Sequence, residues 1–184
     1  MVQAINGRIY IQNELLGLNE GAVTFAPKVK KFLETHYPGY SVRLFGDPKG
    51  QDKGQADERT AYDIFRSLGM PVQPAPGLKQ NMIETRVDAV TKVLNEMHNG
   101  MARFVLSPLC RTLRVAMAGR YHLVREEDGV LRPKKDRYSN PADALQYGIL
   151  GLGEGRALIG LTAAGMTKGM QVYKGHKTMR RIAV

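Results

Sequence analysis

The chain has 184 residues, enough for one domain of ordinary size. Hydrophobic residues make up 43% and charged residues 24%, the balance of a globular protein rather than of a disordered or fibrous one. No apolar run approaches the roughly 18 residues of a membrane span, and the start of the chain lacks the features of a signal peptide. The single cysteine, Cys110, excludes an intramolecular disulfide and a CxxC zinc site, so we expect a reducing compartment.

The positive charge of the chain is concentrated in its C-terminal part. The formal net charge is +10; residues 1–110 carry 13 basic and 11 acidic residues, whereas residues 111–184 carry 14 basic and 6 acidic residues. This imbalance favours a polyanionic partner, most simply nucleic acid, although it also contributes to solubility. The last nineteen residues hold five basic residues and no acidic one, which predicts a solvated basic tail, with contact to DNA or a portal-like partner as the alternative.

The first part of the chain alternates extended and helical patterns. We expect, in order, a strand, a helix, a strand, a loop, a helix and an extended edge segment at residues 7–16, 23–36, 41–46, 49–56, 57–68 and 70–76. Apolar side chains at helical spacing define the helices. The edge segment holds three prolines in seven residues, which excludes a central strand.

The same alternation continues in the second part. We expect a helix, a strand, a helix, a β-hairpin and a helix at residues 81–97, 102–107, 109–118, 121–133 and 139–150. The first of these helices has the most regular pattern, and its predicted core face consists of Ile83, Val87, Val90, Leu94 and Met97. Asp128-Gly129 supplies the positive φ angles expected of the hairpin turn. The order of elements predicts an α/β sandwich around a mixed sheet, in one domain.

Asp47 is the first candidate functional residue. It follows the predicted strand 41–46 and precedes a glycine-containing loop, the position where open α/β sheets place functional groups. A carboxylate at such a strand end must be hydrogen-bonded, paired or bound to a metal to offset its desolvation. The alternative is that Asp47-Pro48 only starts a turn.

Asp143 is the second candidate. The expected N-cap of the last helix is Ser139 or Asn140, with Pro141 in the first turn, so Asp143 is expected at the second or third helical position. There the helix dipole alone stabilises a carboxylate. The functional alternative is that the helix directs Asp143 toward Asp47, so that the two carboxylates share divalent metals. In that case the preceding basic residues meet the phosphates of a nucleic acid: Lys134, Lys135 and Arg137.

Three segments resemble, in order and spacing, the large terminase subunit of tailed phages. They are FGDPKGQDKGQADERTAYDIFRSLGM, then PAP with Asn81 and RVDAV, and finally RPKKDRYSNPADALQYGILGLGEG. The resemblance is to the C-terminal nuclease domain of that subunit and covers residues 7–156. It implies an RNase H-like fold, a mixed sheet flanked by helices with a β-hairpin insertion before the last helix. We therefore expect a nuclease domain over 1–156 and the basic tail over 157–184.

The resemblance also implies a site. It places Asp47 on the aspartate of a GDP-type motif and Asp143 on the last metal-binding aspartate, within an S-H-x-x-D-A-x-x-Y motif. Asn140 stands where many relatives have histidine, which leaves it a site-adjacent residue. The implied activity is that of a DNA endonuclease with two Mg²⁺ or Mn²⁺ ions, which cuts concatemeric DNA during genome packaging. The implied partners are double-stranded DNA and other terminase or portal components, in the cytoplasm of a bacterial host and without a membrane.

The loop after Asp47 resembles the variable loop near the active site of the family. Its basic residues, Lys49, Lys53 and Arg59, are therefore candidate contacts to DNA phosphates, as are those before the last helix. Asp57 lies in the same region, and we interpret it as a helix-capping residue first and a site-adjacent residue second.

The sequence departs from the family at its start. The first catalytic aspartate of the family lies on a strand before the predicted strand 7–16, and this chain has no acidic residue before Glu14. No GxxxxGK[ST] motif of the ATPase domain is present. Glu14 as a replacement ligand is the less favoured interpretation; a solvated or structural carboxylate is the favoured one. The alternative function is a catalytically incomplete module that binds DNA or a partner. An RNA-binding domain is a weaker alternative, because the thirteen aromatic residues form no spaced stacking pattern.

Overall fold

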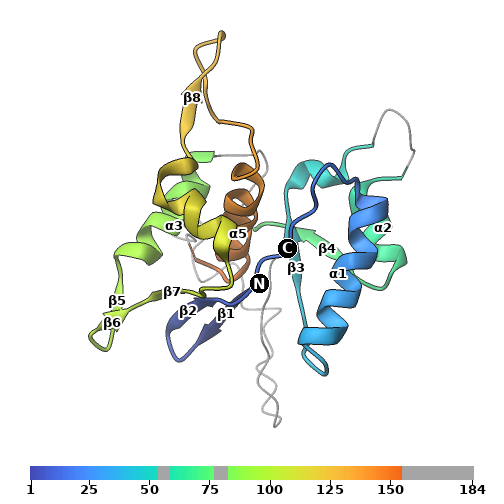
Figure 1. Ribbon diagram of the computed structural model, residues 1–184, viewed down its shortest axis with the longest axis horizontal. Coiled ribbons are helices and arrows are strands. Elements are labelled where there is room, and N and C mark those ends of the chain that lie inside the picture. Colours follow the sequence, from blue (N-terminus) through green and yellow to red (C-terminus); the bar gives the residue numbers. More distant parts are fainter. Residues whose placement is uncertain (54–58, 77–82, 155–184) are drawn as a thin grey trace, which may run out of the picture.

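The computed structural model describes residues 1–53, 59–76 and 83–154. The chain is a mixed α/β protein, as the sequence predicts. Its elements form two groups that meet at the last helix, α5 (Figure 1). The strands are β1 (Val2–Ile5), β2 (Arg8–Ile11), β3 (Leu44–Gly46), β4 (Val72–Pro74), β5 (Met97–His98), β6 (Met101–Ala102), β7 (Phe104–Leu106), β8 (Leu123–Arg125) and β9 (Leu131–Pro133). The helices are α1 (Ala22–His36), the 3₁₀ turn η1 (Pro48–Gln51), α2 (Ala61–Ser67), α3 (Ile83–Asn95), α4 (Arg111–Val115), the π-helical η2 (Ala116–Arg120) and α5 (Ser139–Gly151).

The first group contains a three-stranded sheet with the order β1-β2-β7. Strands β1 and β2 are antiparallel and joined by Asn6-Gly7, whose φ angles of 47° and 77° suit a two-residue hairpin turn. Strand β2 is parallel to β7, with Ile9 opposite Phe104. The predicted strand 7–16 is thus shorter than expected, and its partner β1 was not predicted, because four residues are too few to show a period.

The second group contains the parallel pair β3–β4, with Leu44 opposite Val72. The strand predicted over 41–46 is confined to its last three residues, and the proline-rich segment forms the edge strand β4, as its composition indicates. Helices α1 and α2 pack beside this pair (Figure 1). Their shared core consists of Ala26, Val29, Leu44, Phe65 and Met70.

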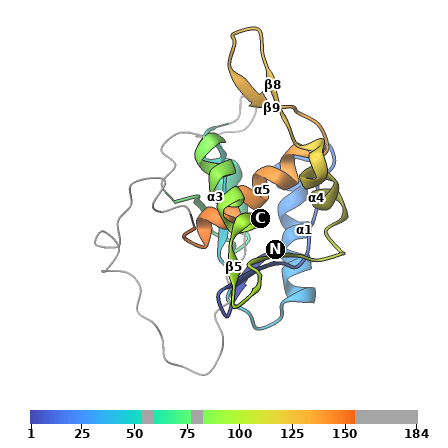
Figure 2. The ribbon, with the colours of Figure 1, turned by 90° about the vertical axis from the view of Figure 1, so that its left-hand side faces the viewer.

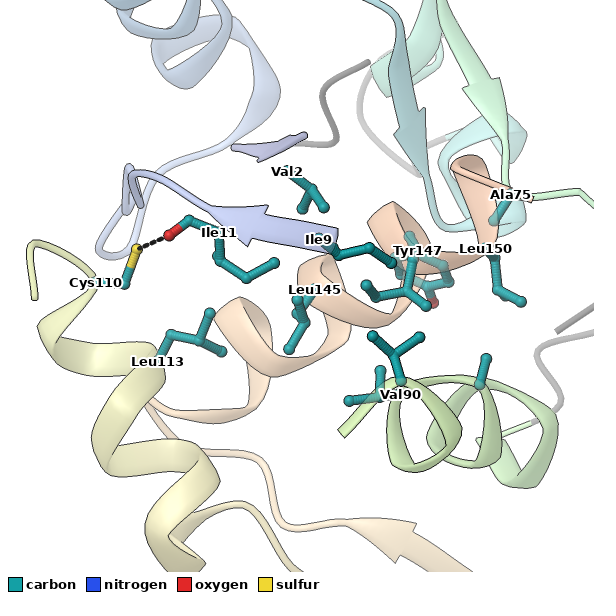
Figure 3. Packing of buried hydrophobic residues seen from close by; sticks show 13 residues of the cluster. Val2, Ile9, Ile11, Ala75, Val90, Cys110, Leu113, Leu145, Tyr147 and Leu150 are labelled. Carbon is teal, nitrogen blue, oxygen red and sulfur yellow. Dashed lines mark hydrogen bonds between the residues drawn. The ribbon is translucent and has the colours of Figure 1, made fainter. Parts of the chain in front are cut away.

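Helix α5 forms the centre of the larger core. It packs against α3, α4, β1 and β3, so it belongs to both groups of elements. Every residue from Leu145 to Gly151 is buried. Figure 3 shows α5 side chains packed between β2 and α3. Cys110 lies in this core, where its thiol donates a weak hydrogen bond to the Ile11 carbonyl at 3.8 Å; burial raises its pKa.

Helix α3 buries a different face from the predicted one. Its buried residues are Thr85, Arg86, Ala89, Val90 and Val93, whereas Leu94 and Met97 are exposed. Only Val90 belongs to both the predicted and the observed face. Relative to the prediction, the helix is rotated about its axis, because the small Ala89 allows a close approach to α5 and because Arg86 bonds to Asp143 of α5.

The β8–β9 hairpin projects from the body of the molecule in both views (Figures 1 and 2). Of its predicted turn pair only Gly129 has a positive φ, 77°. Asp128 instead accepts a hydrogen bond from the Val130 amide at 2.9 Å, which stabilises a longer turn. Before the hairpin, the predicted helix 109–118 is divided into α4 and η2.

No helix among the described residues is long and apolar enough to cross a membrane. The predicted tail, 157–184, lies outside the described residues, as does Asp57. Residues 111–154 carry 8 basic and 6 acidic residues, so most of the excess positive charge of the C-terminal part belongs to residues after 154, which the structure does not describe.

Candidate functional site

Asp47 lies directly after β3. Its side chain caps the 3₁₀ turn η1, where one carboxylate oxygen accepts a hydrogen bond from the Lys49 amide at 3.0 Å. The Tyr62 hydroxyl donates to the Asp47 carbonyl at 2.8 Å. The Asp-Pro sequence thus forms the turn it predicts, and this turn holds the carboxylate at the end of the strand.

Asp143 lies in the second turn of α5, not at the second or third position. The helix begins at Ser139, so Asp143 is its fifth residue and no acidic residue occupies the first turn. The helix starts early because Asp136 accepts hydrogen bonds from the Tyr138 amide and the Ser139 hydroxyl at 2.8 and 2.9 Å, which forms the preceding turn. Stabilisation by the helix N-terminus therefore does not explain Asp143.

Among the residues that the structure describes, three side chains contact the Asp143 carboxylate. Arg86 of α3 approaches Oδ1 at 3.4 Å, and the Tyr121 hydroxyl donates to the same oxygen at 3.2 Å. Lys135, in the segment before α5, lies 3.7 Å from Oδ2. The Asp143 side chain is 15% exposed and that of Arg86 only 1%, so this ion pair lies at the border of the core.

Tyr147 connects the two candidate aspartates. It follows Asp143 by four residues on α5, which places both on one face of the helix. Burial raises the pKa of the Tyr147 hydroxyl, as does its hydrogen bond to the Asp47 carboxylate. The Arg86 guanidinium lies over the Tyr147 ring, 4.7 Å from its centroid. Asp47, Arg86, Tyr121, Asp143 and Tyr147 thus form one group, the aspartate cluster.

The sequence interpretation missed Arg86 and Tyr121 as members of the cluster. Arg86 had a detectable signal, because it falls at i, i+3, i+4 and i+7 spacing with Ala89, Val90 and Val93, a helix face on which an arginine is unusual. Tyr121 carried no comparable signal, since it reaches Asp143 only through the tertiary fold.

Two of the predicted DNA contacts lie beside the aspartates of the cluster. Lys49 is exposed two residues after Asp47, and Lys135 is exposed beside Asp143. Lys53 and Arg59 are exposed on either side of the segment 54–58. Lys53 pairs with Thr60 through an isolated antiparallel β-bridge of the backbone.

The remaining predicted residues lie in the segment before α5 and in its first turn. Lys134 is exposed, and its amide donates to the His122 carbonyl at 3.1 Å. Arg137 lies over the Tyr138 ring, 5.4 Å from its centroid. Arg137 and Asn140 line a largely apolar cavity of about 290 Å³ between α1, the β1–β2 hairpin and α5, rather than the aspartate cluster.

Glu14 has a structural role. Its two carboxylate oxygens accept hydrogen bonds from the amides of Thr112 and Leu113 at 2.7 and 2.9 Å. These amides belong to the first turn of α4, whose unpaired N–H groups a carboxylate stabilises. The interpretation of Glu14 as a structural carboxylate is therefore the one that the contacts support.

The aspartate cluster offers the oxygen ligands that Mg²⁺ and Mn²⁺ prefer. Magnesium is commonly bound by one or two carboxylates, with water and substrate phosphates as further ligands, so Asp47 and Asp143 fit such an ion. Among the described residues only Lys135 contacts Oδ2 of Asp143. No group of three or more His, Cys, Asp or Glu side chains converges in the described part of the chain.

The fold and the site together define a mixed α/β protein with two aspartates joined through a buried arginine and a tyrosine. Comparisons of the chain with protein-family models, curated proteins and solved structures found no match. The cluster and the resemblance of the sequence are therefore the basis for a functional proposal.

Proposed function

We propose that this chain is the metal-dependent DNA endonuclease domain of a phage or prophage terminase large subunit, with an RNase H-like fold. One observation carries the proposal: Asp47, at the end of a parallel strand, and Asp143, on the last helix, both contact the group formed with Tyr147 and Arg86. These are the two aspartates that the resemblance identifies as metal ligands.

Asp47 and Asp143 would hold the metal ions through carboxylate oxygens. Bound divalent ions supply an activated water and stabilise the leaving 3′ oxygen of a phosphodiester. The chain's own residues fix the two carboxylates: Arg86 and Tyr121 bind Oδ1 of Asp143, and Tyr147 donates to Asp47. Oδ2 of Asp143, beside the exposed Lys135, is the oxygen best placed to meet an incoming ion.

Exposed basic residues next to the cluster would bind the phosphates of double-stranded DNA. Lys49 and Lys135 each lie close to one of the aspartates, and Lys134 and Arg137 flank Lys135 in the chain. Contacts of this kind position the backbone without reading its sequence, so cleavage should show little sequence preference. Other subunits of a packaging motor are the expected protein partners.

Plasmid nicking tests the proposal directly. We expect the purified chain to nick supercoiled DNA in Mn²⁺ or Mg²⁺ and not in EDTA, with a loss of more than about 100-fold in Asp47→Ala and Asp143→Ala. Asp88→Ala is the matched control, because Asp88 is an exposed carboxylate of α3. Nicking that ignores EDTA, or that persists in both aspartate variants, would contradict the proposal.

A catalytically incomplete binding module is the second candidate function. It is favoured by Glu14, whose carboxylate is bound to α4, so the described cluster contains two carboxylates only. This module would bind DNA with steep salt dependence and would not nick it. The binding is measured by titrating labelled duplex at several salt concentrations. Replacing Lys134, Lys135 and Arg137 by alanine should lower the salt slope by about 2–3, whereas replacing Lys28, Lys30 and Lys31 removes equal charge and should leave it unchanged.

A further inference from the structure

Arg86 is the largest fully buried side chain of the described residues. A buried guanidinium is strongly disfavoured unless its charge and its N–H groups are compensated. The compensation here is incomplete: Nη1 approaches Asp143 at 3.4 Å, and Nε has no hydrogen-bond partner among the described residues. Stability of the core alone does not account for such a residue, because a hydrophobic side chain of similar volume is often equally stable in place of a buried ion pair.

The contacts of Arg86 reach both candidate aspartates. It binds Oδ1 of Asp143 directly. It also packs on the ring of Tyr147, whose hydroxyl is hydrogen-bonded to Asp47. The guanidinium is planar and can bind a carboxylate at its edge while its face lies on an aromatic ring, which an ammonium cannot do. One side chain of α3 therefore lies between the carboxylate that follows β3 and the carboxylate on α5.

We propose that Arg86 is the positioning residue of the aspartate cluster, which fixes Asp143 through Oδ1 and Asp47 through Tyr147 so that both carboxylates bind one set of divalent ions. The inference rests on the proposed function in its metal-binding part. Its structural part, the coupling of Arg86 to Asp47 through Tyr147, stands without a metal. Arg86 acts through other side chains and is not itself expected to contact the substrate.

The first experiment measures Mn²⁺ binding to the full chain, without DNA, by isothermal titration calorimetry. We expect Arg86→Met to weaken binding at least about 10-fold, as the loss of residues that orient ligands does elsewhere, and Arg86→Lys to restore part of it. The matched control is Arg66→Met, which breaks the exposed Arg66–Asp63 pair on α2. Wild-type affinity in a folded Arg86→Met chain would overturn the proposal. If Arg86→Met does not fold, Arg86→Lys decides: wild-type affinity overturns the proposal, and weakened affinity at an unchanged melting temperature supports it.

The second experiment is a double-mutant cycle of urea unfolding without metal. Arg86→Met and Asp47→Ala are measured singly and together, because a local structural role of Arg86 predicts additive effects at Asp47. We expect the combined effect on the unfolding equilibrium constant to differ at least about threefold from additivity. In a Tyr147→Phe background, which keeps the ring and removes the hydroxyl, the two changes should become additive within about twofold.

The two experiments separate the failure of the inference from the failure of the proposed function. A wild-type chain that binds no Mn²⁺ contradicts the metal site, while the cycle still decides whether Arg86 positions Asp47. Additivity in the wild-type background overturns the inference, even if the chain binds metal and cuts DNA. Coupling that persists in the Tyr147→Phe background overturns the proposed route through Tyr147.

Discussion

Gly151 of α5 lies against the ring of Phe45 in β3, and a Cβ at Gly151 would be 2.3 Å from Phe45 Cδ2. Phe45 is 2% exposed and precedes Asp47 by two residues, while Gly151 ends the helix that carries Asp143. The absence of a side chain at Gly151 thus sets how closely β3 approaches α5. The distance between the two aspartates depends on this contact.

Gly151→Ala should therefore destabilise the chain by about 1–3 kcal/mol, because the added methyl group displaces a buried ring. Urea unfolding measures the change. Gly21→Ser is the control, since a Cβ at Gly21 meets nothing within 4 Å and serine is a favoured residue at the N-cap of α1, which Gly21 occupies. Equal effects of the two substitutions would contradict the close packing of α5 on β3.

Glu14→Ala should lower the free energy of unfolding by about 1–3 kcal/mol, because two amides of α4 lose a charged acceptor. Mn²⁺ binding and DNA nicking should remain at the wild-type level. Glu34→Ala, at an exposed position of α1, is the matched control for stability. A loss of nicking as large as that of Asp47→Ala, without loss of stability, would instead make Glu14 part of the metal site.

Lys135→Gln should raise the affinity for Mn²⁺ by about two- to fivefold at low ionic strength, because a competing cation is removed from Oδ2 of Asp143. The Lys135 side chain is 74% exposed, so salt should screen the effect. The effect should vanish near about 0.5 M salt, where the Debye length is about 5 Å or less. Lys92→Gln removes a comparable ion pair on α3, with Glu96, and should change nothing.

Stability should fall as the pH rises from about 10 to about 12, in part because of Tyr62. Burial, with the nearby Asp47 charge, raises the pKa of Tyr62 from 10.0 to about 12. Below pH 10 the hydroxyl is protonated in both the folded and the unfolded chain; between the two values only the unfolded chain releases its proton, which favours unfolding. Urea unfolding at pH 8, 10, 11 and 12 measures the loss, up to about 2 kcal/mol from this group. Tyr62→Phe should have a shallower slope in this range, and an unchanged slope would contradict the assignment.

The long helices were the most predictable part of the fold. Helices α1 and α3 agree with the predictions within a few residues, because each has three or more turns of periodic apolar side chains. Strands β1, β5 and β6 have two to four residues each, too few to show a period. Their hairpins had a local signal only in the turns, Asn6-Gly7 and Asn99-Gly100, because Asn-Gly favours a two-residue hairpin turn.

The candidate site was predictable only in part. Asp47 was identified by its position after a predicted strand, and both Asp47 and Asp143 by the resemblance to the terminase family. In the structure Asp47 is hydrogen-bonded to Tyr147, which lies one helical turn after Asp143 on α5. The position of Asp143 in α5 was wrong by about two residues, because the Asp136 turn extends the helix backward. Arg86 was missed because an analysis of hydrophobic periods assigns a charged residue to the solvent face, whereas a partner on another helix keeps this one in the core.

The central place of α5 has a consequence for synthesis of the chain. This helix supplies Leu145, Tyr147, Ile149 and Leu150 to a core whose other buried members, from Val2 to Leu113, all precede it in the chain. A ribosome releases the chain from its N-terminus, so these apolar surfaces stay open to water until α5 has left the exit tunnel. Chaperone binding to the nascent chain is therefore expected to end only when α5 can close the core.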